Sequence, residues 1–134
     1  MRQRWYAPLL KASYGTSLFV MEQFPNVKFK VDRQTVTAKK IKRVVHFEVD
    51  GQPIVLARSE IDIAKTKPQI VRELKEGKKP MGLILQKFKV KHTRLRATSR
   101  TREFHYTGDM NAKIWERFLV EPRRAEKNKL PANE

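Results

Sequence analysis

The chain contains no cysteine, so disulfide bonds and thiolate metal sites are excluded. Glycine and proline are scarce, with 5 and 7 copies among 134 residues, which argues for a globular chain and against a disordered one. No apolar run approaches the ~18 residues of a membrane-spanning helix, and the chain shows no recognisable signal peptide. These absences together predict a water-soluble, cytoplasmic protein.

Acidic residues are few relative to basic ones. The 14 Asp and Glu stand against 30 Lys and Arg, which gives a formal net charge of +16. Such an excess predicts an anionic partner, and nucleic acid, an anionic membrane surface and a small anionic ligand all satisfy it. Composition alone does not choose among these three.

The order of hydrophobic patterns predicts one α+β domain. Apolar residues alternate in several segments, which indicates strands, and recur at helical spacing in others. Short turns between the strands imply an antiparallel sheet of about six strands, with flanking helices that enclose an internal ligand site. The domain is expected over 1–122, followed by a basic tail over 123–134 that we expect to fray. The predicted helices cover 8–13, 16–23, a segment that starts at 66–68 and runs through 76, and 83–86. The predicted strands cover 27–31, a hairpin over 41–62, 88–98, 101–107 and 112–120, and the segment 33–38 either continues the strand over 27–31 or pairs with it.

Arg43 stands out in the first strand of the central hairpin. It shares one strand face with Ile41, Val45, Phe47 and Val49, because side chains alternate with a period of two. A guanidinium on a buried face keeps its charge and needs an anionic partner, or it costs several kcal/mol. Arg43 is therefore the first candidate functional residue.

Glu116 is the second anomaly, in the last predicted strand. It interrupts a face formed by Ala112, Ile114, Phe118 and Val120. Two inward charges of opposite sign are expected to meet inside the protein. They form either a structural buried salt bridge or an enclosed ligand site, in which the arginine clamps a carboxylate and the glutamate handles a hydroxyl or a proton.

Other motifs give weaker signals. The three histidines are widely spaced, and His46 and His92 fall on strand faces that also carry Lys or Arg, which disfavours a metal site. Thr16 or Ser17 is the expected N-cap of the second helix, and Gly82 is interpreted as a turn glycine. The chain lacks the nucleophile elbow, P-loop and dinucleotide fingerprints.

Two further features concern the basic residues. The run over 87–102 is rich in Lys and Arg, and a nucleic-acid groove would use such residues for phosphate contacts. A solvated, charged strand face explains the same run, and the chain lacks helix-turn-helix and ribonucleoprotein signatures. Arg58 shares a strand face with Ile54, Leu56 and Glu60, and a local ion pair is the interpretation for it.

At the residues above, the sequence resembles the chorismate pyruvate-lyase family over roughly residues 9–122. Each matching motif is short, but the motifs occur in the right order, and two of them fall on Arg43 and Glu116. The stretches that carry the resemblance are Leu9-Leu10, Gly15-Thr16-Ser17, Glu22, Lys42-Arg43-Val44-Val45, Asp50-Gly51-Gln52-Pro53, Ala57-Arg58, Lys79-Pro80-Met81-Gly82 and Glu116-Arg117-Phe118-Leu119.

The resemblance implies a fold, an activity and a set of site residues. The fold is a six-stranded antiparallel sheet with helices that cover an internal site, and the reaction converts chorismate to 4-hydroxybenzoate and pyruvate without metal or organic cofactor. Arg43 matches the arginine that binds the ring carboxylate, and Glu116 matches the glutamate near the ring hydroxyl. Met81 matches a position whose backbone contacts the ligand, and Ser17 matches the remaining ligand contact.

Three functions therefore remain open at this stage. The first is a cofactor-free chorismate lyase, with Arg43 and Glu116 as catalytic residues. The second is a non-catalytic sensor of a small aromatic acid on the same fold, and the third is a basic nucleic-acid-binding module.

Overall fold

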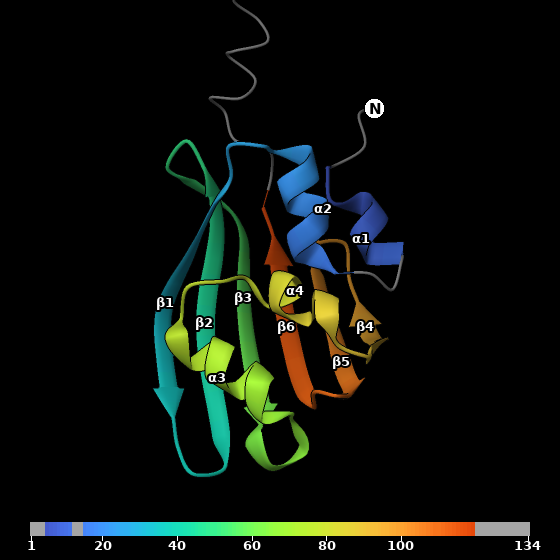
Figure 1. The fold of residues 1–134 in the computed structure, drawn as a ribbon. Coiled ribbons are helices and arrows are strands. Elements are labelled where there is room, and N and C mark those ends of the chain that lie inside the picture. Colours follow the sequence, from blue (N-terminus) through green and yellow to red (C-terminus); the bar gives the residue numbers. More distant parts are fainter. Residues whose placement is uncertain (1–4, 12–14, 120–134) are drawn as a thin grey trace, which may run out of the picture.

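The computed structural model describes residues 5–11 and 15–119. These residues form a single six-stranded antiparallel sheet with four short helices, which confirms the predicted α+β class (Figure 1). The strand order is β1-β2-β3-β6-β5-β4. The elements are α1 (Ala7–Lys11), α2 (Thr16–Gln23), β1 (Lys28–Val36), β2 (Lys40–Val49), β3 (Gln52–Asp62), the 3-10 turn η1 (Ile63–Lys65), α3 (Pro68–Glu76), α4 (Met81–Ile84), the 3-10 turn η2 (Leu85–Lys87), β4 (Val90–Ala97), β5 (Thr101–Gly108) and β6 (Ala112–Phe118).

The central hairpin turns as its sequence predicts. Asp50 and Gly51 have φ angles of 52° and 81°, and positive φ at both central residues is typical of the turn that joins two tightly paired strands. The segment over 33–38, which was expected either to continue the strand over 27–31 or to pair with it, continues it, and the two form one strand, β1. The pairing of β1 with β2 shifts between Val31 and Arg33, so the strand continues through a bulge.

The helix ends are partly as predicted. Pro68 occupies the first turn of α3, and the helix ends at Gly77, whose φ of 67° is the left-handed value that glycine adopts without strain. The predicted N-cap of α2 was wrong. Gly15 holds that position and no side chain caps the helix, because the Thr16 hydroxyl donates a hydrogen bond to Glu116 instead.

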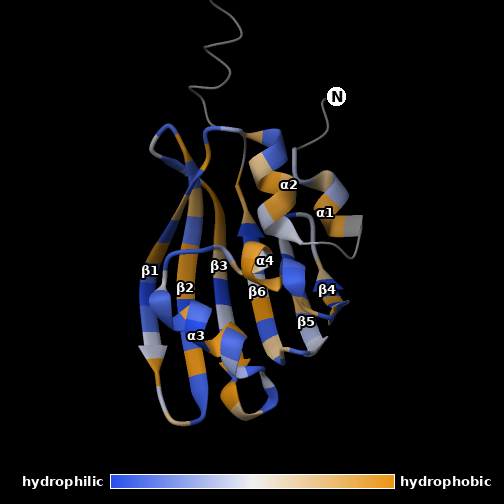
Figure 2. Cartoon of the chain, in the orientation of Figure 1, coloured by the Kyte–Doolittle hydropathy of each residue, from blue (hydrophilic) through white to orange (hydrophobic). Residues whose placement is uncertain are grey.

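All four helices lie on one face of the sheet (Figure 1). Hydrophobic and hydrophilic residues alternate along the central strands, as a sheet covered on one face requires (Figure 2). The covered face holds two separate hydrophobic clusters. One packs under α3 and α4 and includes Ile41, Ile61, Leu74, Phe104 and Ile114, and the other packs under α1 and α2 and includes Trp5, Leu9, Phe47, Val55 and Phe118.

Buried polar side chains lie between these two clusters. Along β2, Arg43 separates Ile41 from Phe47, and along β6, Glu116 separates Ile114 from Phe118. The interruption that the sequence shows is therefore a polar layer across the sheet. The predicted basic tail over 123–134 and the last residue of the predicted final strand lie outside the described residues.

Candidate functional site: a buried polar layer with a cavity

Arg43 is buried, with 2% of its surface exposed. Its Nη2 donates one hydrogen bond, to the backbone oxygen of Lys79 at 3.3 Å, and its guanidinium lies 5.7 Å from the ring centroid of Phe29. Its Nε has no hydrogen-bond partner among the described residues. Burial lowers the pKa of Arg43 from 12.5 to about 10. The charge is therefore enclosed and only partly satisfied.

Glu116 is also buried, and its carboxylate has two partners. Arg102 Nε donates a hydrogen bond to Glu116 Oε1 at 3.1 Å, and Arg102 Nη2 lies 3.0 Å from the same oxygen. The Thr16 hydroxyl donates to Glu116 Oε2 at 2.5 Å. Arg102 also donates to the backbone oxygen of Leu9 at 2.9 Å and to Thr16 at 2.7 Å. Burial raises the pKa of Glu116, while the Arg102 guanidinium and the Thr16 hydrogen bond oppose that rise.

Arg43 and Glu116 do not form the buried salt bridge that was one of the two alternatives, because Arg102 is the partner of Glu116. The register explains the separation. Arg43 pairs with Ser59 and Glu116 pairs with Ala57, so the two charges lie on opposite sides of β3 and two residues apart along it. Standard strand spacings then put their Cα atoms roughly 12 Å apart. Both side chains do point to the covered face, as predicted.

The space between these charges is a cavity of about 50 Å³. Its lining includes all four residues that the sequence analysis selected, and β3 contributes the small side chains of Ala57 and Ser59, whose cross-strand neighbours are all larger. The small residues leave the space open. The full lining is Thr16, Ser17, Phe29, Arg43, Val45, Phe47, Ala57, Ser59, Met81, Gly82, Phe104, Tyr106, Ile114 and Glu116.

Helices α2 and α4 close the cavity on the side away from the sheet. The Gly82 backbone N–H donates to Ser17 Oγ at 3.2 Å, which joins the two helices. A Cβ added at Gly82 would lie 2.8 Å from Ser17 Cβ and Oγ, so only glycine allows this approach. The interpretation of Gly82 as a turn residue was therefore wrong. Met81 and Ser17 both lie at this closure.

Arg102 is the site residue that the sequence analysis missed. It was counted within the exposed basic run over 87–102, but it is 1% exposed. Alternation along β5 puts Arg102 on the same face as Phe104 and Tyr106, and this pattern was available in the sequence.

Burial raises the pKa of Tyr106, and the nearby Glu116 raises it further against the opposing effect of Arg102. Tyr106 is therefore a neutral hydrogen-bonding group at the cavity wall.

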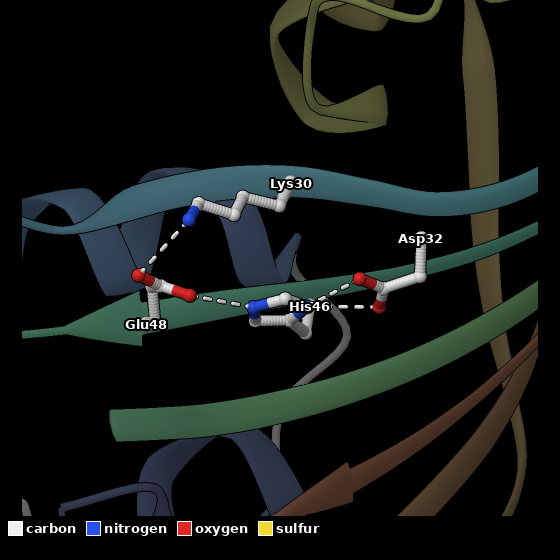
Figure 3. Close-up of polar contacts among 4 residues, drawn as sticks. All are labelled: Lys30, Asp32, His46 and Glu48. Carbon is white, nitrogen blue, oxygen red and sulfur yellow. Dashed lines mark hydrogen bonds and ion pairs between the residues drawn. The ribbon is translucent and has the colours of Figure 1, made fainter. Parts of the chain in front are cut away.

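Two histidines have defined environments. His92 stacks on Phe104, with ring centroids 4.0 Å apart, and burial followed by the charge of Arg102 lowers its pKa to about 4. His46 lies on the opposite face of the sheet, between Asp32 and Glu48 (Figure 3).

His46 is held from both sides. Its Nδ1 is 2.8 Å from Asp32 and its Nε2 is 2.7 Å from Glu48, which also pairs with Lys30 at 3.4 Å. Burial lowers the pKa of His46, but the hydrogen bonds with Asp32 and Glu48 outweigh it, and the net pKa is raised. Among the described residues, no group of three or more His, Cys, Asp or Glu side chains is arranged to hold a metal ion.

Arg58 differs from its prediction. Its guanidinium lies 5.2 Å from the ring centroid of Trp115, and it forms no ion pair with any residue in the described part of the chain. Glu60, the expected partner, pairs with Lys40 at 3.5 Å. Arg58 therefore belongs to an aromatic contact on the face of the sheet that carries no helix.

In comparisons with known proteins, no family model and no curated protein sequence matches this chain. Within residues 5–11 and 15–119, no helix is long and apolar enough to cross a membrane.

Proposed function

We propose that the protein binds a small carboxylic acid in the cavity between the sheet and helices α2 and α4. One observation carries the proposal. The buried charged side chains among the described residues are Arg43, Arg102 and Glu116, so the interior holds two cations and one carboxylate. A buried charge without a counter-charge costs several kcal/mol, and an anionic ligand in the cavity removes that cost.

Arg43 is the group that the ligand would contact. Its guanidinium lines the cavity and keeps a donor unused, and arginine binds carboxylates through two parallel hydrogen bonds. Arg102 is less available, because it donates to Glu116, Thr16 and the backbone of Leu9. The apolar walls from Phe29, Phe104 and Ile114 would suit a ring.

We further propose chorismate as this acid, with elimination of pyruvate as the reaction, because the residues at the cavity are those that carry the family resemblance. Chorismate has two carboxylates. Two buried arginines balance that dianion when Glu116 is protonated, and burial raises the pKa of Glu116 in the required direction.

The reaction needs positioning and one proton transfer. The bond between the ring carbon and the enolpyruvyl oxygen breaks, the ring carbon that bears the hydroxyl loses a proton, and the departing enolpyruvate gains one at its methylene to become pyruvate. The ring becomes aromatic, so the reaction runs downhill without a cofactor. Glu116 would orient the ring hydroxyl and exchange the proton, and Arg43 would fix the ring carboxylate.

The size of the cavity requires an opening motion. Its volume of about 50 Å³ lies well below the ~300–1,000 Å³ of typical ligand pockets. Entry of a ring-sized ligand would separate α2 from α4, whose polar link is the hydrogen bond between Gly82 and Ser17. Release of product through the same route would then limit turnover.

The test mixes the purified protein with chorismate and follows both pyruvate formation and the loss of chorismate absorbance. Arg43→Met should abolish pyruvate release, and Arg72→Met, which removes an exposed arginine of α3, should leave it unchanged. Wild-type pyruvate formation at the uncatalysed rate would reject the lyase.

A non-catalytic binder of an aromatic acid is the second candidate, and the contacts of Glu116 favour it. Arg102 and Thr16 already hold both carboxylate oxygens, which restricts the glutamate as a proton carrier. Calorimetric binding of 4-hydroxybenzoate that Arg43→Met abolishes, without turnover of chorismate, would establish the binder.

A further inference from the structure

The face of the sheet opposite the four helices carries a hollow of its own. Two adjoining depressions of about 520 Å³ and 410 Å³ share Val44, Arg58 and Trp115 in their linings. No described helix covers this face (Figure 1). Leu56, which lines the larger depression, is 40% exposed. The hollow thus exposes apolar and aromatic surface on a strongly charged protein.

One cross-strand row organises the hollow, and we call it the outer row. Register pairs each member with the next across all six strands, from Arg33 through Val44, Arg58, Trp115 and Glu103 to Arg96. Three of its six members are arginines. Arg117 lies beside the row on β6 and lines the larger depression.

The arginines at this hollow are not neutralised by ion pairs with other described residues. None of Arg33, Arg58, Arg96 and Arg117 forms an ion pair with another residue of the described chain. Three acidic side chains line the larger depression: Asp32 interacts with His46, Glu116 is buried with Arg102, and Glu103 belongs to the outer row, where it is outnumbered by the arginines. The surface therefore keeps an unneutralised positive charge next to an aromatic ring.

We propose that the outer row binds single-stranded nucleic acid. A base would stack on the Trp115 ring, and the backbone phosphates would contact the arginines on either side. Arg58 lies over the Trp115 ring, 5.2 Å from its centroid, so an incoming base would displace the guanidinium, which would then stand beside the stacked base as a phosphate-binding group. Single-strand binding proteins combine the same two elements, a positive groove and aromatic platforms.

The other occupants fit less well. A second copy of the chain would bring two molecules of net charge +16 together, and mutual repulsion opposes that contact. A duplex hides the faces of its bases, so Trp115 would have nothing to stack on. An acidic peptide would satisfy the arginines but would not need the aromatic ring.

The experiment measures fluorescence anisotropy with a labelled oligothymidylate of about 16 nucleotides, the upper site size of one small binding module. If the arginines neutralise three to four phosphates, affinity should fall about twenty- to fifty-fold as the salt concentration rises from about 50 to about 200 mM. Trp115→Ala should weaken binding at least fivefold, and Trp115→Phe should restore most of it, because phenylalanine also stacks. Circular dichroism confirms that each variant is folded.

A charge-matched pair of variants separates this site from general attraction. Arg58→Gln with Arg117→Gln should weaken binding at least tenfold and reduce the salt slope by about 1.4. Arg72→Gln with Lys75→Gln removes two exposed charges from α3, on the other side of the sheet, and should change affinity less than threefold.

Four binding results would overturn the proposal, and so would one result on the oligomeric state. These are equal losses from the two double variants, no effect of Trp115→Ala, equal affinity for polyglutamate, and tighter binding of a duplex of the same length. A dimer that forms through this face in sedimentation and excludes the oligonucleotide would also overturn it. Oligonucleotide binding and pyruvate release are measured separately, so failure of this proposal and failure of the proposed function of the cavity give different results.

Discussion

Replacing Arg43 by methionine should stabilise the protein and abolish the proposed binding of a carboxylic acid. Burial lowers the pKa of Arg43 to about 10, which means that burial destabilises the charged form by about 3 kcal/mol, at about 1.36 kcal/mol per pKa unit. Methionine removes that cost and fills similar space. The variant loses one hydrogen bond to Lys79 and one contact with Phe29, worth about 1 kcal/mol each. The net gain is therefore about 1 kcal/mol.

Thermal unfolding measures the first half of this prediction. A gain of about 1 kcal/mol corresponds to a Tm increase of roughly 3 °C for a chain of this length. Calorimetry with 4-hydroxybenzoate measures the second half, and loss of a two-point arginine contact should weaken binding by at least about a hundredfold.

Arg102→Met is the contrasting variant. It leaves Glu116 buried without its cation, so it should destabilise the protein by about 3–5 kcal/mol. The reasoning fails if Arg43→Met lowers the Tm as Arg102→Met does, because Arg43 would then be a structural residue. It also fails if Arg43→Met is stable and still binds the acid as the wild type does.

Three further predictions concern Gly82 at the contact between α2 and α4, proton transfer by Glu116, and His46 on the face of the sheet without helices. Gly82→Ala should destabilise the protein by about 1–3 kcal/mol in thermal melts, because its methyl group meets Ser17, and a variant as stable as the wild type would contradict the close approach. Glu116→Gln should bind 4-hydroxybenzoate within tenfold of the wild type but release pyruvate at least a hundredfold more slowly, and unchanged turnover would exclude Glu116 as the proton carrier. The raised pKa of His46 gives a stabilising contribution that is complete below pH 6.5 and is lost as the pH rises through the raised value. His46→Gln should therefore lower the Tm more at about pH 5.5 than at about pH 9, and an equal loss at both would refute the charged pair with Asp32.

Local sequence rules predicted most of the strands. Alternation identified β2 and β6, because one face of each strand is buried and a shift of one residue would expose its apolar side chains. The bulge in β1 was missed, because an extra residue near Asp32 depends on pairing with β2 rather than on the pattern of β1 itself.

The candidate site was predicted in part. Arg43 and Glu116 were found because each interrupts an apolar face, and Ser17 and Met81 came only from the family resemblance. All four line one cavity. Arg102 was missed because its neighbours in sequence are basic, and that local composition concealed its place on a buried strand face.

The sequence by itself determined which side chains face inward along each strand, because that depends on a period of two within a single segment. It also determined the large positive charge. Only the tertiary structure decided which charges pair, since β3 lies between Arg43 and Glu116 while β5 brings Arg102 beside the glutamate. Strand order is a property of the whole sheet, and no single strand encodes it. The exposed row around Trp115 arises for the same reason, because β3 must pair with β6, which is distant in sequence, before the arginines of the two halves share one face.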